Sequence, residues 1–262
     1  GELKQRTHEH AGVLAGINSA DGNSIFIMKD EGGNEIGHFV SIPFEGGKPQ
    51  DLTPDLPPYS SFVMNQSHSG NALGFIGANQ SGFTAYALQS GKAKSFFTSP
   101  HLCNGPDFSA NGELAIISST DRTKSTDSSL VAFDVASGKQ IAELWDGDGS
   151  SIESVIFSPL QGDARLLATS SKTGFERPLI WNLLTNERKD LKLDEVPGSI
   201  SAWDWSPDAK RILLLQLFQA QYQLYVYDIE SDNTLKLNHP QGVLGGFSRG
   251  YFADNNEIWI TW

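Results

Sequence analysis

Gly246, Ser248 and Gly250 match the pattern Gly-x-Ser-x-Gly, which can present a nucleophilic serine at a sharp turn between a strand and a helix. Such a serine needs an acid and then a histidine further along the chain. Twelve residues follow Gly250 and none of them is histidine. The segment also lies where a strand of a repeat is expected. We therefore predict a strand here and no catalytic residue in this chain.

Asp146–Gly149 reads Asp-Gly-Asp-Gly and resembles the start of a calcium-binding loop. That loop requires glycine at its sixth position and glutamate at its twelfth, where this chain has Ser151 and Phe157. His8 and His10 lie close together, but no His-x-x-x-His pair is available to bind zinc. The sequence therefore predicts a polar turn between repeats, no metal site and no cofactor.

The elements that must position any site recur along the chain. A short phrase, clearest in Phe157–Pro159 and Trp205–Asp208, has its first residue at positions 18, 66, 108, 157, 205 and 252. A spacing of 42 to 49 residues with strand-like content between copies is typical of a β-propeller. We therefore predict an all-β chain built from four-stranded antiparallel blades.

Each phrase is followed by three runs rich in β-branched and aromatic residues, as in Arg211–Leu215, Gln223–Asp228 and Thr234–Leu237. No long window has the period of a helix. The strand before each phrase is expected to be the innermost of its blade, and Asp134, Asn182 and Asp228 recur as structural residues at the ends of third strands. A polar segment, 1–10, precedes the predicted blades, which span 11–57, 58–102, 103–150, 151–198, 199–244 and a partial sixth, 245–262.

The sixth repeat contains only two of its expected strands, whereas five repeats are complete. We therefore expect the chain to be part of a larger, seven-bladed ring. An unfinished blade leaves an unpaired strand edge and an apolar face. Residues 245–262, which include Trp259 and Trp262, are expected to contact a following domain or a second copy of the chain.

Composition narrows the class of partner. The chain has 19 Lys and Arg against 31 Asp and Glu, a formal charge of −12, which argues against nucleic acid or an anionic membrane as the partner. Ile212–Leu217 is the longest strongly apolar stretch and is too short to span a bilayer. Cys103 is the single cysteine, so an internal disulfide is excluded and a reducing, cytoplasmic location is expected.

Residues 29–54 carry a more specific signal. The loop Lys29–Glu35, the strand around Phe39–Ile42 and the segment Glu45–Pro54 follow one another in an order that resembles the amino-terminal blade of the prolyl oligopeptidase family, especially its acylaminoacyl-peptidase branch. Trp205–Asp208 is shared with that family and with TolB-like propellers. The resemblance departs at Gly37-His38, where the family pattern would place a bulkier residue beside the aromatic strand.

In that family the propeller covers an α/β-hydrolase domain that carries a Ser-Asp-His triad. The resemblance therefore implies a noncatalytic propeller that admits short peptides to a serine peptidase, with the hydrolase domain of the same protein or a second copy as its partner. It also singles out Asp30 and Glu35 as candidate binding residues. Glu35 would bind a peptide amine or contact the hydrolase domain; alternatively, both acids accept backbone N–H bonds within a glycine-rich turn.

Two other functions stay open. One is a free-standing interaction scaffold, similar to WD-repeat or TolB-like propellers. The other is an enzyme whose site lies at the central channel, which requires acids or a metal converging from the innermost strands. Glu153 and Asp204 are nearly the only acids expected there.

Overall fold

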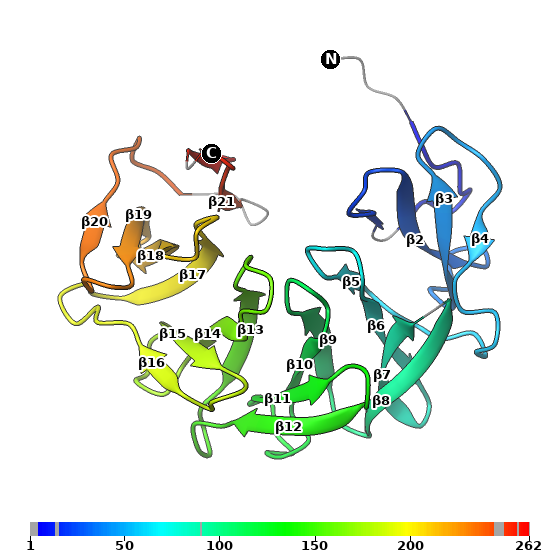
Figure 1. Ribbon diagram of the computed structural model, residues 1–262, viewed down its shortest axis with the longest axis horizontal. Coiled ribbons are helices and arrows are strands. Elements are labelled where there is room, and N and C mark those ends of the chain that lie inside the picture. Colours follow the sequence, from blue (N-terminus) through cyan, green and yellow to red (C-terminus); the bar gives the residue numbers. More distant parts are fainter. Residues whose placement is uncertain (1–4, 14–15, 90, 244–248, 256, 262) are drawn as a thin grey trace. The chain divides into compact units, whose positions relative to one another are not determined.

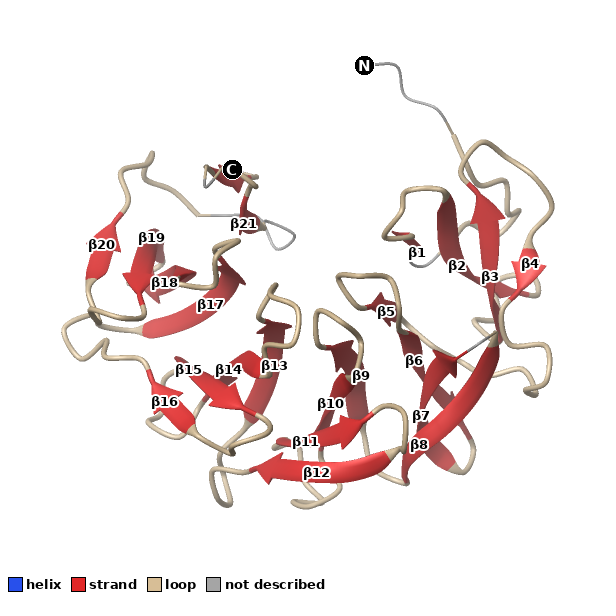
Figure 2. Cartoon of the chain, viewed as in Figure 1, coloured by secondary structure: helices blue, strands red, loops and turns tan. Residues whose placement is uncertain are grey.

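All regular structure in the described part of the chain is β-strand (Figure 2). The computed structural model describes residues 5–13, 16–89, 91–243, 249–255 and 257–261. Five of its sheets have four strands and a sixth has two, and every pairing within them is antiparallel. Over these same residues, no helix has the length and apolar character needed to cross a membrane.

The strands follow the repeats in order. The first sheet contains β1 (Gly16–Asn18), β2 (Ser24–Asp30), β3 (Gly37–Pro43) and β4 (Gln50–Asp51). The second contains β5 (Met64–Gln66), β6 (Leu73–Asn79), β7 (Gly82–Gln89) and β8 (Lys92–Ser99). The third contains β9 (Cys103–Phe108), β10 (Leu114–Ser119), β11 (Ser129–Asp134) and β12 (Lys139–Leu144). The fourth contains β13 (Ile152–Phe157), β14 (Arg165–Ser170), β15 (Arg177–Asn182) and β16 (Arg188–Asp190). The fifth contains β17 (Ser199–Trp205), β18 (Arg211–Phe218), β19 (Gln221–Asp228) and β20 (Thr234–Lys236), and the sixth contains β21 (Gly250–Phe252) and β22 (Ile258–Ile260).

Spatial order equals chain order in every sheet, so the first strand of each repeat lies at an edge. The second strand lies inside the sheet and is buried on both faces. In β10 all six residues are buried, which explains why this strand reads as an apolar run and not as an alternation. The predicted four-stranded antiparallel sheets are therefore confirmed.

The recurring phrase is a turn between the first and second strands. In the fifth sheet, Ser206 Oγ donates to Asp208 Oδ1 at 2.6 Å and accepts the N–H of Arg211 at 2.9 Å. Ser19 and Ser109 make the same pair of bonds in their own repeats. The serine recurs because a short hydroxyl can close this turn from within.

A second recurring residue closes the turn after the third strand. Asp228 Oδ1 accepts the N–H of Ser231 at 2.8 Å and its hydroxyl at 2.7 Å. Asp134 does the same with Ser137, and Asn182 accepts two backbone N–H groups of the turn that follows it. The structural role predicted for these three residues is confirmed.

The chain divides into two compact units, residues 1–121 with 133–140, and residues 122–132 with 141–262. In the first unit, an aromatic core joins the first two sheets. Phe75 stacks on Tyr59 and Tyr86, with ring centroids 4.7 and 5.2 Å apart, and Phe39 packs against Phe75 at 5.2 Å. The hydroxyl of Tyr59 also contacts the backbone of β3, because its Oη accepts the Phe39 N–H at 3.0 Å.

Gly37 has a physical reason to be small. A Cβ at this position would lie 1.9 Å from the carbonyl oxygen of Lys29. The Gly37 backbone pairs with Asp30 across the β2–β3 hairpin and exchanges two hydrogen bonds with Tyr59, at 3.0 and 3.1 Å. The bulkier residue that the family pattern would place here does not fit this backbone.

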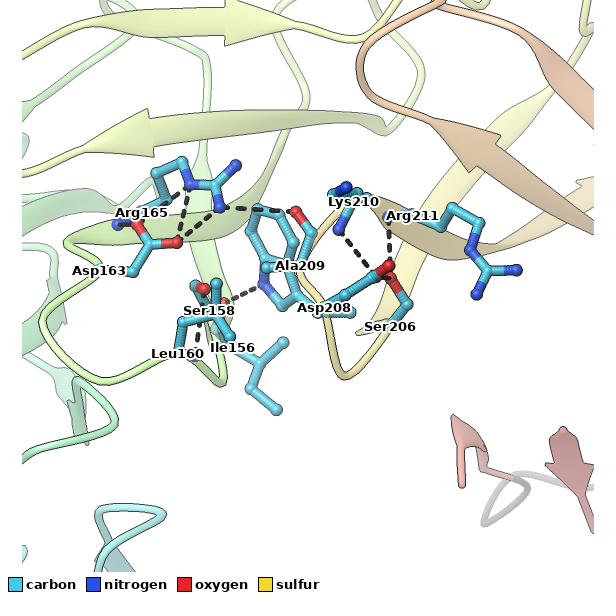
Figure 3. A network of polar contacts seen from close by, with 11 residues as sticks. Ile156, Ser158, Leu160, Asp163, Arg165, Ser206, Asp208, Ala209, Lys210 and Arg211 are labelled. Atoms are coloured by element: carbon cyan, nitrogen blue, oxygen red, sulfur yellow. Dashed lines mark hydrogen bonds and ion pairs between the residues drawn. The ribbon is translucent and has the colours of Figure 1, made fainter. Parts of the chain in front are cut away.

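In the second unit, one core lies between the fourth and fifth sheets and another between the fifth and sixth. Trp205 is 2% exposed and donates its Nε1–H to the carbonyl of Ile156 at 3.1 Å (Figure 3). Arg165 lies over the Trp205 ring at 5.2 Å, and Asp163 holds its guanidinium with bonds of 2.6 to 3.0 Å. Burial raises the pKa of Asp163, but hydrogen bonds from Arg165 and Ser158 outweigh it, so that pKa is lowered.

Candidate functional site

A hollow in the second unit lies over the first strands of three successive sheets. β13 and β17 contact one another, and β17 contacts β21 (Figure 1). The hollow has a volume of about 600 Å³ and is lined by residues of these strands and of the segments beside them. We call it the first-strand groove; the lining residues used below are Glu153, Thr169, Glu176, Ser201, Trp203, Arg249 and Gly250.

Two β-bulges shape the floor of the groove. Pairing of β13 with β14 shifts between Ser154 and Ile156, and pairing of β17 with β18 shifts between Ala202 and Asp204. The residues passed over are Val155 and Trp203, and both line the groove. A bulge re-aims a side chain that a regular pleat would direct elsewhere, which accounts for an aromatic ring at this position.

Two carboxylates lie along the groove. Glu153 accepts hydrogen bonds from the hydroxyls of Ser128 and Ser151, the latter at 3.2 Å. Glu176 accepts the hydroxyl of Ser201 at 2.7 Å. Both glutamates are exposed, so each keeps acceptor capacity for a ligand beyond its serine partners.

Arg249 supplies the only cation that lines the groove among the described residues. Its backbone is held by Thr261, whose Oγ1 accepts the Arg249 N–H at 3.0 Å. The next residue, Gly250, lies so close to Trp203 that a Cβ there would be 2.7 Å from the indole ring. Glycine at 250 therefore lets β21 lie against the ring that forms the floor.

Asp204 does not belong to the groove lining. Its Oδ2 accepts the N–H of Phe252 at 2.8 Å and so ties the fifth sheet to the sixth. Burial raises the pKa of Asp204, and the N–H groups of Phe252 and Trp205 only partly offset that effect. Asp107 is the equivalent residue in its own repeat, because it also directly precedes the first residue of the recurring phrase. In the first unit, Asp107 Oδ1 accepts a hydrogen bond from the side-chain amide of Asn65 at 3.1 Å. This acid is a recurring tie between neighbouring sheets.

Sequence reasoning identified Glu153 but missed Glu176, Ser201 and Arg249. The pairing of β13 with β14 was a signal that could have identified Glu176 as a neighbour of Glu153. Glu153 pairs with Thr169, and the loop that carries Glu176 begins just after Ser170, at the same end of the sheet. Arg249 had no such signal, because its place depends on how β21 packs against Trp203.

Asp30 and Glu35 lie together in the first unit. They line a cavity of about 210 Å³ with Met28, Gly33 and residues 11–13. Asp30 Oδ2 accepts the N–H of Glu35 at 2.8 Å, and Glu35 has a positive φ of 59°. The turn role expected for Asp30 is therefore present, while the carboxylate of Glu35 stays exposed beside the cavity.

The two remaining sequence patterns are accounted for differently. Asp146, the first residue of the Asp-Gly-Asp-Gly segment, has a buried side chain that bonds Ser170 and Arg188. Burial raises the pKa of Asp146, but those bonds outweigh it, so that pKa is lowered. Within the described residues, no three His, Cys, Asp or Glu side chains cluster so as to hold a metal. Ser248 lies outside the described residues, and Gly250 opens β21.

A groove of this kind suits an extended polar chain better than a compact substrate. Within the described residues, the outer edges of β13 and β17 pair with no other strand, and an unpaired edge can add an extended segment through backbone hydrogen bonds. The exposed carboxylates add acceptors, Arg249 adds donors, and Trp203 adds an apolar surface. The arrangement can bind a peptide segment.

Comparisons with known proteins agree on the fold. No family model matches the chain, and none of the curated proteins compared matches it. Among solved structures, the chain is similar to TolB from Acinetobacter baumannii, with 13% identity, a TM-score of 0.58 and coverage of 93% of this chain and 56% of that one. It is similar to a prolyl endopeptidase with 11% identity, a TM-score of 0.65 and coverage of 87% and 35%. It is also similar to the β-propeller domain of the Trilobed protease from Pyrococcus furiosus, with 12% identity, a TM-score of 0.61 and coverage of 90% and 72%.

These likenesses, all below 15% identity, establish the fold and no activity. The chain spans little more than half of that TolB chain and about a third of the prolyl endopeptidase chain. The chain is an all-β protein with the β-propeller fold, as its repeat predicts.

Proposed function

We propose that this chain is the noncatalytic, access-limiting propeller of a cytoplasmic serine peptidase of the prolyl oligopeptidase family, in its acylaminoacyl-peptidase-like branch. Its partners are then the catalytic α/β-hydrolase domain of the same protein, or a second copy of the chain, and short peptides. The observation that carries the proposal is that a propeller similar to that of a prolyl endopeptidase also bears the family-like segment 29–54 in its first repeat.

In this proposal, peptides pass along the first-strand groove on their way to the hydrolase domain. Innermost strands of a propeller face the channel that a substrate would cross, and here they carry Glu153, Ser201 and Trp203. Peptides that pass would contact these side chains before they reach a nucleophile. Asp30 and Glu35, at a separate cavity in the first unit, are candidates for contact with the hydrolase domain.

The experiment begins with the complete natural reading frame. Several hundred further residues with an elbow serine, then an aspartate and a histidine, are expected. The full protein should then cleave short peptides, with kcat/KM falling as the peptides lengthen and reaching zero for a folded protein. A stop codon soon after Trp262, or no hydrolysis by the full protein, would overturn the proposal.

A groove variant separates gating from simple attachment. Ser201→Trp narrows the groove and should lower kcat/KM more for the longest cleaved peptides than for the shortest. Leu184→Trp is the matched control, because Leu184 is 66% exposed and does not line the groove. Equal loss for all peptide lengths in Ser201→Trp would contradict a gating role.

A free-standing interaction scaffold is the second candidate. Similarity to TolB over 93% of this chain favours it, because the likeness extends across almost all described repeats. In this case the natural reading frame would end without a hydrolase domain, and the first-strand groove would bind a protein segment.

A further inference from the structure

A further pocket lies on the fifth sheet. It has a volume of about 210 Å³ and lies where the β18–β19 hairpin meets the segment after β20. Its lining is unusually rich in amide side chains, with glutamine at positions 216, 221, 223 and 241. We call it the amide pocket. None of the patterns found in the sequence points to it.

One wall of the amide pocket is held in place by hydrogen bonds. Gln216 is 6% exposed; its Nε2 donates to the Pro197 carbonyl at 2.6 Å, and its Oε1 accepts the Tyr225 hydroxyl at 3.0 Å. Gln223 Nε2 donates to the carbonyls of Leu224 and Leu237, at 2.9 and 2.8 Å. Both amides are thereby fixed in orientation.

His239 completes this wall. Its Nε2 accepts the Leu224 N–H at 3.2 Å, and its Nδ1 lies 2.8 Å from the Pro240 carbonyl. With Nε2 as an acceptor, Nδ1 is the ring atom that can donate to the Pro240 carbonyl. The segment behind it is tied to β19, because the Tyr222 N–H donates to the Gly242 carbonyl at 3.3 Å. The pocket is therefore built from anchored backbone on two sides.

The other side of the pocket has unused polar groups. Within the described residues, the side chains of Gln221, Gln241, Lys236 and Tyr222 make no hydrogen bond or ion pair. The lining contains no carboxylate, so a cationic ligand would meet no counter-charge there. What the pocket offers is amide donors and acceptors, one phenol and one ammonium group.

The rim of the pocket departs from local sequence preference. Gln219 and Ala220 form the two-residue turn between β18 and β19 and have positive φ values of 50° and 59°. Asparagine followed by glycine is the usual choice for such a turn. Departures from local preference cluster at functional sites. Phe218, beside this turn, is 41% exposed and lines the pocket.

We propose that the amide pocket binds a single hexose unit of a glycan. An amide offers a donor and an acceptor side by side, which matches the paired hydroxyls of a sugar ring. Phe218 and Tyr222 offer apolar surface to the C–H face of the ring, and Lys236 donates to a ring substituent. The volume suits one small ring and lies below the ~300–1,000 Å³ of sites for larger ligands. This site is independent of the peptidase proposal.

The test is titration of the ¹⁵N-labelled 262-residue chain with methyl glucoside and, separately, with N-acetylglucosamine. Saturable amide shifts confined to residues 216–223 and 236–242 are expected with at least one of the two sugars. The double variant Gln221→Ala/Gln241→Ala should weaken the Kd at least tenfold. Gln50→Ala, at an exposed glutamine in the first unit, is the matched control and should leave the Kd unchanged.

Three outcomes would overturn the proposal. The first is that neither sugar gives saturable shifts while the spectrum shows a folded chain. The second is that the shifts saturate elsewhere on the chain or that the double variant retains its Kd. The third is that a model peptide amide, N-acetylglycine methylamide, binds at these residues and the sugars do not.

Discussion

The junction between the fourth and fifth sheets and the first-strand groove beside it share β13 and β17 but use different kinds of residue. At the junction, Trp205 and the Ser206–Asp208 turn belong to a phrase that returns in every repeat. In the groove, the residue type at the position of Glu153 does not recur: the equivalent residue is Ser201 in the next repeat and Asn104 in the previous one. Recurring residues build sheets and join them, whereas residues that occur once are available for a ligand.

Asp204 shows how the distinction corrects a reading from sequence. Both Glu153 and Asp204 look like channel acids in the sequence. Asp204 recurs as Asp107 and ties neighbouring sheets by a hydrogen bond, whereas Glu153 does not recur and lies exposed in the groove. Recurrence therefore separates the two acids where residue type alone cannot.

The largest effect is expected at the junction, from Trp205→Ala. The substitution removes a fully packed ring and leaves the Ile156 carbonyl without its partner, so unfolding should become easier by about 3–5 kcal/mol. Chemical denaturation measures the change. The control Trp259→Ala, at a side chain that is 55% exposed, should stay within about 0.5 kcal/mol. Equal costs for the two tryptophans would remove the basis of the comparison.

Asp146→Asn tests an ion pair that holds the fourth sheet and should cost about 1.5–3 kcal/mol at neutral pH. Because the pKa of Asp146 is lowered on folding, its charge stabilises the fold above the ordinary value of 3.8. That contribution is lost as the pH falls from 3.8 through the lower pKa of the folded state. The difference in the free energy of unfolding between wild type and variant should therefore narrow in this range.

Urea denaturation at several pH values would measure this difference in the free energy of unfolding. Asp148→Asn, two residues along and exposed, serves as the control and should change the free energy of unfolding by no more than about 0.5 kcal/mol at neutral pH. A difference between wild type and Asp146→Asn that stays constant from neutral pH to below 3.8 would mean that the Asp146 carboxylate contributes through packing and not through its charge.

Gly250→Ala is expected to cost about 1–3 kcal/mol, because the new methyl group would overlap the Trp203 ring and crowd Leu213. Part of this cost should disappear when the ring is removed, so Trp203→Ala/Gly250→Ala should be less damaging than the sum of the single variants. Thermal unfolding of the four proteins measures the coupling. Strict additivity would indicate that β21 does not lie against Trp203.

Much of the fold could be predicted because repetition averages out local ambiguity. The expected runs Arg211–Leu215 and Gln223–Asp228 lie within β18, which ends three residues later, and β19, which begins two residues earlier. First strands are harder to delimit from the sequence, and β5, for example, has only three residues. Edge strands are short and polar, so composition marks their ends weakly.

The sites could be predicted far less well, for a physical reason. Glu176, Ser201 and Arg249 come from a loop, a strand and a segment between sheets, and only the packing of sheet on sheet brings them together. The amide pocket likewise depends on a turn, Gln219–Ala220, that local preference would not select. The periodicity of apolar residues predicts which side chains face a core, but it does not predict which exposed side chains lie close together.

The smallest effect is expected in the groove, from Glu176→Gln. Glu176 is exposed and its one side-chain partner is the Ser201 hydroxyl, which an amide oxygen can also engage. Stability should therefore change by no more than about 0.5 kcal/mol, and Ser201→Ala should behave alike. Urea denaturation of both variants, alongside Trp205→Ala, measures the contrast between the two regions. A loss above about 1.5 kcal/mol for either variant would show that groove residues also hold the fold, and recurrence would no longer distinguish architecture from site.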